Sequence, residues 1–309
     1  MRQAENQVPL KSGGEETGLR CLYTPTRIGT LHAAFTAVAA VVLTGLLGAQ
    51  AQGLTDLKGT IVFSSDRSGP WRLWLVNADG SDLRQLTQGA GEEQDVDPVF
   101  STDGTKVLFS STRGGKPGIW TITLSGGEPE RVCDGDQAEW SPDEKQIAFR
   151  RDKRVWVRTL ASGSEKAVSP ESYPNCSGPA WHPKNSSLTF AARWDAGNAI
   201  FLMPPDGEPA KVYDKKGACE PHFTPDGALI VYETETNICT IQPDGEKNRT
   251  ITFQAGVQRY GRPSPDGQHI VYCQGVSEKG PWELYVVSIK GGYPVKLTNG
   301  GSDMNPDWK

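Results

Sequence analysis

Short apolar stretches alternate with short polar turns along most of the chain, and the alternation has a regular period. One turn recurs five times, as STDG at 101–104, SPDE at 141–144, HPKN at 182–185, TPDG at 224–227 and SPDG at 264–267. The third residues of these turns lie 40, 41, 42 and 40 positions apart. Because proline fixes φ, aspartate bonds the backbone that follows it and glycine accepts a positive φ, each copy predicts a tight hairpin turn.

Each turn belongs to a longer unit that contains four predicted strands. A first strand ends at the turn, and an apolar strand such as VLFSS (107–111) follows it. A third strand such as GIWTI (118–122) comes next, and a short fourth strand ends in an aliphatic residue. Four short strands in a unit of about 40–45 residues are typical of one blade of a β-propeller. Counting the third strands gives six blades.

The two ends of the repeat predict how the ring closes. The first copy begins at Gly59 with its second strand, and the C-terminal DMNPDW (303–308) matches the first-strand sequence DVDPVF (95–100). We therefore predict an all-β fold, a six-bladed β-propeller of four-stranded antiparallel blades, closed by the C-terminal strand pairing into the first blade. Bulky residues of the first strands should fill the gaps between blades: Phe100, Trp140, Trp181 and Phe223.

The first 51 residues differ from the repeats. Arg20 and Arg27 precede an uncharged apolar segment at 31–47, and Ala49 and Ala51 form the small-x-small pattern of a signal-peptidase site. We expect residues 1–51 to be a signal peptide and residues 52–309 to be the propeller. The alternative is an uncleaved signal anchor, because a run of this length can span a bilayer. Either interpretation predicts export, to the periplasm or a comparable compartment, with membrane anchoring only if the signal stays uncleaved.

Composition and charge narrow the function classes. The 35 Gly and 22 Pro favour many turns over long helices, and the net charge of −5 argues against nucleic-acid binding. Five cysteines remain after residue 51, an odd number, so at least one is expected to stay free or to pair between molecules. Without metal-type CxxC spacing, most of them are interpreted as small buried hydrophobes: Cys133, Cys176, Cys219, Cys239 and Cys273.

Residues 86–120 fit the pattern LTxG…DxxPxFSxDGxxxxFxSxRxGxxxIW. This unit resembles the propeller repeat of the TolB family of exported bacterial envelope proteins. The resemblance covers roughly residues 54–309 and implies partners among envelope proteins, such as a peptidoglycan-associated lipoprotein. TolB proteins carry an α/β domain before the propeller, whereas here we expect the propeller to follow the signal directly. We expect a monomer.

Three common catalytic motifs are missing from the sequence. The chain has no GxSxG, GxxxxGK or HExxH string, so we expect a binding scaffold that is not an enzyme.

Carboxylates are the strongest candidate site. Inner strands of a propeller begin at one mouth of the channel, so acidic residues near these points should gather there, Glu139 and Asp307 among them. Clustered oxygens would suit calcium, although no DxDxDG loop is present and a solvated acidic rim is the simpler interpretation. We expect no cofactor. The candidate binding residues at the mouth are Asp97, Asp136, Glu220, His222, Arg262 and Asp303.

A second function class stays open from the sequence. A carbohydrate-active, small-ligand or metal-binding propeller would use the central channel, with Glu220, His222 and Arg262 as its residues. Arg67 and Arg113 follow second strands in FSSDR and FSSTR, and Arg193 has a similar place in FAARW. These arginines are interpreted as structural, bonding loop carbonyls or the turn aspartate.

Overall fold

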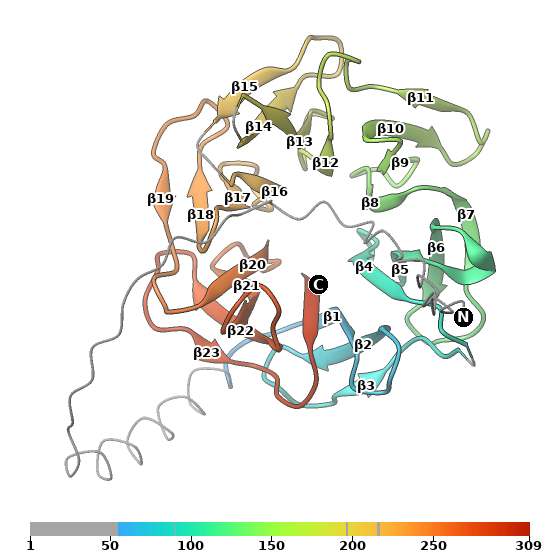
Figure 1. The fold of residues 1–309 in the computed structure, drawn as a ribbon, viewed down its shortest axis with the longest axis vertical. Helices are drawn as coiled ribbons and strands as arrows, with labels where there is room; N and C mark the ends of the chain where they lie inside the picture. The colour runs from blue at the N-terminus through green and yellow to red at the C-terminus, as the bar shows by residue number, and fades with distance from the viewer. Residues whose placement is uncertain (1–54, 90, 196, 215–216) are drawn as a thin grey trace, which may run out of the picture.

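The computed structural model describes residues 55–89, 91–195, 197–214 and 217–309 of the chain. Within these ranges the strands form six four-stranded sheets arranged as blades around a ring (Figure 1). Neighbouring strands of a blade are antiparallel, which confirms the predicted all-β six-bladed propeller. No helix in the described ranges is long and apolar enough to cross a bilayer. The predicted signal, residues 1–51, lies outside the described residues.

Every blade is built in the order inner, second, third and outer strand. The inner strands are β4 (Asp95–Phe100), β8 (Asp136–Trp140), β12 (Ser177–Trp181), β16 (Cys219–Phe223), β20 (Val257–Pro263) and β24 (Asp303–Trp308). The second strands are β1 (Thr60–Ser65), β5 (Lys106–Ser111), β9 (Gln146–Arg151), β13 (Leu188–Trp194), β17 (Ile230–Glu233) and β21 (His269–Gly275). A short 3₁₀ turn, η1 (Arg113–Gly115), follows β5.

The third and outer strands complete the blades. The third strands are β2 (Arg72–Asn77), β6 (Gly118–Thr123), β10 (Arg154–Thr159), β14 (Gly197–Met203), β18 (Ile238–Ile241) and β22 (Trp282–Ser288). The outer strands are β3 (Arg84–Gln85), β7 (Glu130–Asp134), β11 (Glu165–Ala167), β15 (Ala210–Tyr213), β19 (Arg249–Thr250) and β23 (Val295–Lys296). We number the blades by the chain order of their third strands, so that blade 1 contains β2 and blade 6 contains β22.

The ring closes in blade 1, where the C-terminal strand β24 pairs with β1 (Figure 1). Ile61 lies opposite Trp308, and the backbones of Thr60 and Lys309 exchange hydrogen bonds of 2.6 and 2.9 Å. This pairing confirms the predicted closure by the C-terminal strand. It gives β1 a partner that it would otherwise lack at the centre of the ring.

The hydrophobic core consists of clusters that lie between neighbouring blades. One cluster joins blade 6 to blade 1 and contains Phe63, Trp282 and Trp308. Phe100 and Phe223 are buried as expected, whereas Trp140 and Trp181 are only partly buried against their clusters. The cysteines Cys133, Cys176, Cys239 and Cys273 are free and buried, which confirms for these four that they serve as small core residues.

Because all six blades have the same order of antiparallel strands, from inner to outer, the six inner strands run in the same direction along the channel. We call the end of the ring where they begin the mouth face, and define it by their first residues: Asp95, Asp136, Ser177, Cys219, Val257 and Asp303. Connections between blades and hairpins between second and third strands lie at the mouth face. Hairpins between third and outer strands lie at the opposite face.

Candidate functional site

A β-bulge interrupts every inner strand at the same place. In β4 the register with β5 shifts between Val96 and Val99, and the other five inner strands shift at the equivalent positions. At each bulge one residue has a positive φ between 48° and 55°. These six residues, here called the bulge ring, are Asp97, Gln137, Gly178, Glu220, Tyr260 and Asn305. A bulge turns its residue out of the normal strand alternation, and here the turn aims six side-chain positions at one channel.

All six members of the bulge ring line a cavity in the channel. Two residues further along each inner strand lies a second ring: Val99, Glu139, Ala180, His222, Arg262 and Asp307. Val99, Glu139, His222 and Arg262 of this ring line the same cavity. The cavity has a volume of about 30 Å³, which is room for a few water molecules.

Arg262 is the cation at the centre of the second ring. Its Nη1 donates to Glu139 Oε2 at 3.1 Å, lies 2.9 Å from His222 Nδ1, and lies 4.0 Å from Asp307 Oδ1. Since a guanidinium can only donate, His222 Nδ1 must accept, and the imidazole is therefore neutral. Burial and the adjacent Arg262 both lower the pKa of His222 well below its ordinary value.

Glu220 of the bulge ring is a buried carboxyl with few partners to compensate its charge. Gln137 donates to Glu220 Oε1 at 3.2 Å and accepts from the Gly178 backbone N–H at 3.2 Å. Gly178 leaves room for Glu220, because a Cβ at this position would lie 3.0 Å from Glu220 Oε2. The sequence therefore places an amide and a glycine where they accommodate this carboxyl.

Burial dominates the electrostatics of the channel. Burial, with the charges of Glu233 and Asp97, raises the pKa of Glu220 to about 8. Burial also raises the pKa of Glu139 to about 7, with Asp307 contributing and Arg262 opposing. The pKa of Asp97 rises to about 6, mainly through burial and then through Asp136. Near neutral pH Glu220 and part of Glu139 hold protons that exposed carboxyls would release, so the channel carries less negative charge than its composition indicates.

The structure brings four of the six sequence-predicted residues together, since Asp97, Glu220, His222 and Arg262 all line the cavity. Asp136 lies one residue before the bulge ring and pairs with Arg150, through two hydrogen bonds of 2.6 Å.

Asp303 lies outside the cavity lining. It precedes the bulge-ring residue Asn305 by two positions, is fully buried, and accepts two hydrogen bonds of 2.7 and 2.6 Å from Arg67. This contact ties β24 to the residues that follow β1, so Asp303 belongs to the closure of the ring and does not line the cavity.

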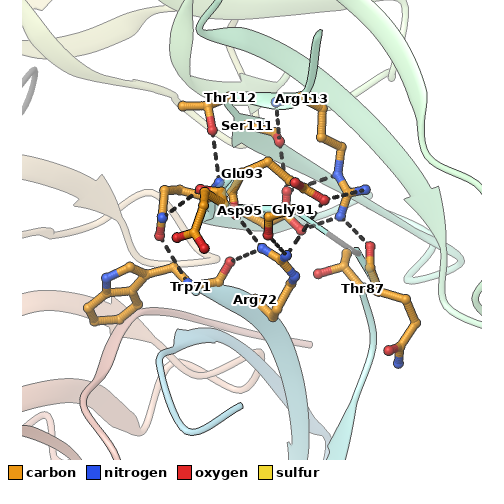
Figure 2. Close-up of polar contacts among 12 residues, drawn as sticks. Trp71, Arg72, Thr87, Gly91, Glu93, Asp95, Ser111, Thr112 and Arg113 are labelled. Carbon is orange, nitrogen blue, oxygen red and sulfur yellow. Dashed lines mark hydrogen bonds and ion pairs between the residues drawn. The ribbon is translucent and has the colours of Figure 1, made fainter. Parts of the chain in front are cut away.

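The same contact recurs in blade 2. Asp95 accepts hydrogen bonds of 3.0 and 2.6 Å from Arg113, which also donates to the Gln88 carbonyl (Figure 2). The predicted structural role of Arg67 and Arg113 is therefore present. Their carboxylate partner is the residue that begins the inner strand, not the turn aspartate.

Sequence reasoning missed four members of the bulge ring, namely Gln137, Gly178, Tyr260 and Asn305. A signal was available, because each lies directly before the position that holds proline in four of the six inner strands, as in Asp97-Pro98 and Glu220-Pro221. No group of three or more His, Cys, Asp or Glu side chains in the described ranges is arranged to hold a metal ion.

Comparison with known proteins agrees with this architecture. A 23% identical relative over 234 residues is the "Tol-Pal system protein TolB" of Francisella tularensis, with 68% of this chain and 53% of that protein covered. The chain thus spans about half the length of this curated relative.

Two solved structures share the fold. The crystal structure of TolB from Acinetobacter baumannii superposes with a TM-score of 0.70 at 18% identity, covering 89% of this chain and 74% of that one. An oligogalacturonate lyase in complex with manganese superposes with a TM-score of 0.53, also at 18% identity, covering 79% of this chain and 74% of that one. The family model described as the TolB beta propeller domain matches residues 58–154 and 137–309. The chain belongs to the TolB beta propeller domain family.

Proposed function

We propose that the protein is an exported, non-catalytic scaffold that binds another protein of the bacterial envelope through the mouth face. The family supports a TolB-like role, and the apolar segment at 31–47 with its small-x-small exit supports export. A periplasmic location follows from this proposal.

The size of the channel cavity carries the proposal. Pockets for small ligands usually enclose about 300–1,000 Å³. The cavity here has a volume of about 30 Å³, and Arg262 already binds the side chains around it. Substrate chemistry inside the channel would require these side chains to move apart. Recognition over the outside of the mouth face needs no such change, and rigid rings present their binding loops in this way.

Charge indicates the kind of partner. The chain has 37 Asp and Glu against 32 Lys and Arg, and the exposed Glu92 lies just before β4 at the rim of the mouth face. An acidic rim favours a partner with a basic patch, and attraction between exposed charges weakens as salt screens it. The relative named as a Tol-Pal system protein makes a peptidoglycan-associated lipoprotein the first candidate partner.

The test is direct binding between purified proteins. The propeller is titrated with the peptidoglycan-associated lipoprotein of the same organism by calorimetry, at low salt and at about 0.5 M salt, where the Debye length is only a few ångströms. We expect a complex whose affinity falls with salt. A missing complex overturns the choice of partner, and an affinity that salt leaves unchanged overturns the electrostatic account.

A further inference from the structure

Blades 1 and 3 share an arrangement in which an arginine covers a tryptophan. The guanidinium of Arg67 lies 5.0 Å from the ring centre of Trp74, and that of Arg151 lies 4.2 Å from the ring centre of Trp156. Both tryptophans are the third residue of a third strand. Arginine above an indole face is a favourable cation–π geometry. In each blade a phenylalanine lies opposite the tryptophan on the second strand: Phe63 and Phe149.

Blade 2 has the same aromatic pair without the cation. Trp120 is the third residue of β6 and lies opposite Phe109. Arg113 follows β5 as Arg67 follows β1, and it binds Asp95 in the way that Arg67 binds Asp303. Unlike Arg67, Arg113 also donates to the Gln88 carbonyl (Figure 2). In the part of the chain that the structure describes, no Arg or Lys lies over the Trp120 ring within the distances seen in blades 1 and 3.

An open groove lies at Trp120. Its volume is about 690 Å³, and we call it the Trp120 groove. The groove is open enough for side chains to enter, since a Cβ added at Gly114 or Gly115 would meet no atom within 4 Å. The lining residues are Glu92, Glu93, Thr112, Arg113, Gly114, Gly115, Trp120, Glu128 and Pro129.

The charges of the groove do not balance. Glu93 is shared between Arg72 at 3.6 Å and Arg113 at 4.0 Å, and Arg113 also pairs with Asp95 at 2.6 Å. Glu92 and Glu128 are exposed, and neither has an ion-pair partner among the described residues. Two carboxylates are thus left over in a groove that also contains a tryptophan.

The wall of the groove is fixed before anything binds. The buried Arg72 donates to the carbonyls of Trp71 and Gly91 at 3.0 Å each, and also to the Glu93 carbonyl (Figure 2). Gln94 and Thr112 exchange hydrogen bonds of 2.8 and 3.1 Å across the same loop. A preformed site loses little conformational entropy on binding.

We propose that the Trp120 groove binds an arginine or lysine side chain of a partner protein. The partner's cation lies over Trp120, as Arg67 and Arg151 lie over the tryptophans of blades 1 and 3, and Glu92 and Glu128 supply the opposing charge. The groove adjoins the mouth face, because Glu92 and Glu93 directly precede β4. This inference rests on the proposed binding role and adds the chemical group that is recognised.

The test uses a short peptide as the probe. The protein is labelled with 5-fluorotryptophan, and the ¹⁹F resonance of Trp120 is assigned by the Trp120→Phe substitution. Acetyl-Gly-Ser-Arg-Ser-Gly-amide is then titrated, with the citrulline peptide as an uncharged control of the same shape. We expect the arginine peptide alone to shift the Trp120 resonance in a saturable way. The double substitution Glu92→Gln with Glu128→Gln should weaken this binding by about tenfold or more.

A matched control is Glu246→Gln, at an exposed glutamate that does not line the groove. It should leave the titration unchanged. Any of three results would overturn the inference: the arginine peptide leaves the Trp120 resonance unshifted, the citrulline peptide shifts it equally, or Glu246→Gln weakens binding as much as the double substitution. If the peptide does not bind but the lipoprotein binds in a salt-sensitive way, only the inference about the groove is rejected. Peptide success without any lipoprotein complex rejects the proposed partner instead.

Discussion

The channel and the Trp120 groove are both lined by acidic residues, yet burial gives their carboxylates different roles. The channel leaves about 30 Å³, and its Glu139, Glu220 and Asp97 have raised pKa values. The groove opens to about 690 Å³, and its Glu92 and Glu128 are exposed. A buried carboxyl must be paired or take a proton, whereas an exposed one keeps its charge for a partner. The count of acidic residues therefore indicates a binding surface only where solvent reaches them.

The largest expected effect comes from removing the channel cation. Arg262→Leu leaves Glu139 and Asp307 without their guanidinium, and breaking a buried pair in this way costs about 3–5 kcal/mol of unfolding free energy. Arg262 lowers the pKa of Glu139, which is about 7 in the parent, so in the variant Glu139 takes up a proton at a higher pH and the loss should be smaller in acid than in base. Urea unfolding above and below this pH measures both effects.

The matched control for this substitution is Arg193→Leu, at an exposed arginine. It should alter the unfolding free energy by about 0.5 kcal/mol at most. If Arg262→Leu proves equally mild, the channel carboxyls do not depend on Arg262, and the contrast with the groove loses its physical basis.

An intermediate effect concerns the pH dependence of stability. The pKa of Glu220 is raised from an ordinary value of 4.5 to about 8, so the folded protein holds this proton after the unfolded chain has released it. The unfolding free energy should therefore fall as pH rises through this window, by up to about 1.4 kcal/mol per pH unit from this residue. Glu220→Gln should flatten the slope, and urea midpoints across the window measure it. An unchanged slope would show that Glu220 is ionised in the fold.

The smallest effect is expected in the groove. Glu92→Gln together with Glu128→Gln removes two exposed charges that support no part of the fold, so the melting temperature should stay within about 2 °C of the parent. Thermal melting followed by circular dichroism checks this. A drop comparable to that of Arg262→Leu would mean that the groove glutamates are structural, which would erase the contrast with the channel.

The fold could be predicted from the sequence because a propeller repeats its local rules. The turns at 101–104 and 264–267 specify hairpins by residue type alone. The match between 303–308 and 95–100 specified the ring closure, since a first strand missing at one end must be supplied from the other. Because the unit is repeated, its strand pattern can be recognised in several copies, so a departing copy such as HPKN at 182–185 does not prevent prediction of the fold.

The site could be predicted only in part, because its geometry depends on an irregularity. Regular alternation would place Asp95 and Asp97 on the same face of the strand, but the bulge turns Asp97 to the channel while Asp95 binds Arg113. Asp303 begins its inner strand at the mouth face, but it binds Arg67 and does not line the cavity, because it is equivalent to Asp95. The Trp120 groove depends on where Arg113 is directed, and side-chain direction is not encoded in a repeat motif.

The proposal that the mouth face is the recognition surface has a direct test in the intact cell. Phe253 is 75% exposed and lies in the connection from β19 to β20, at the mouth face. Tyr293 is 98% exposed and lies in the hairpin between β22 and β23, at the opposite face. Each is replaced in turn by the photo-cross-linking residue p-benzoyl-phenylalanine, and the products are identified by mass spectrometry after irradiation. The account predicts that position 253 captures an envelope protein and that position 293 does not. Capture at position 293 alone, or equally at both positions, would contradict it.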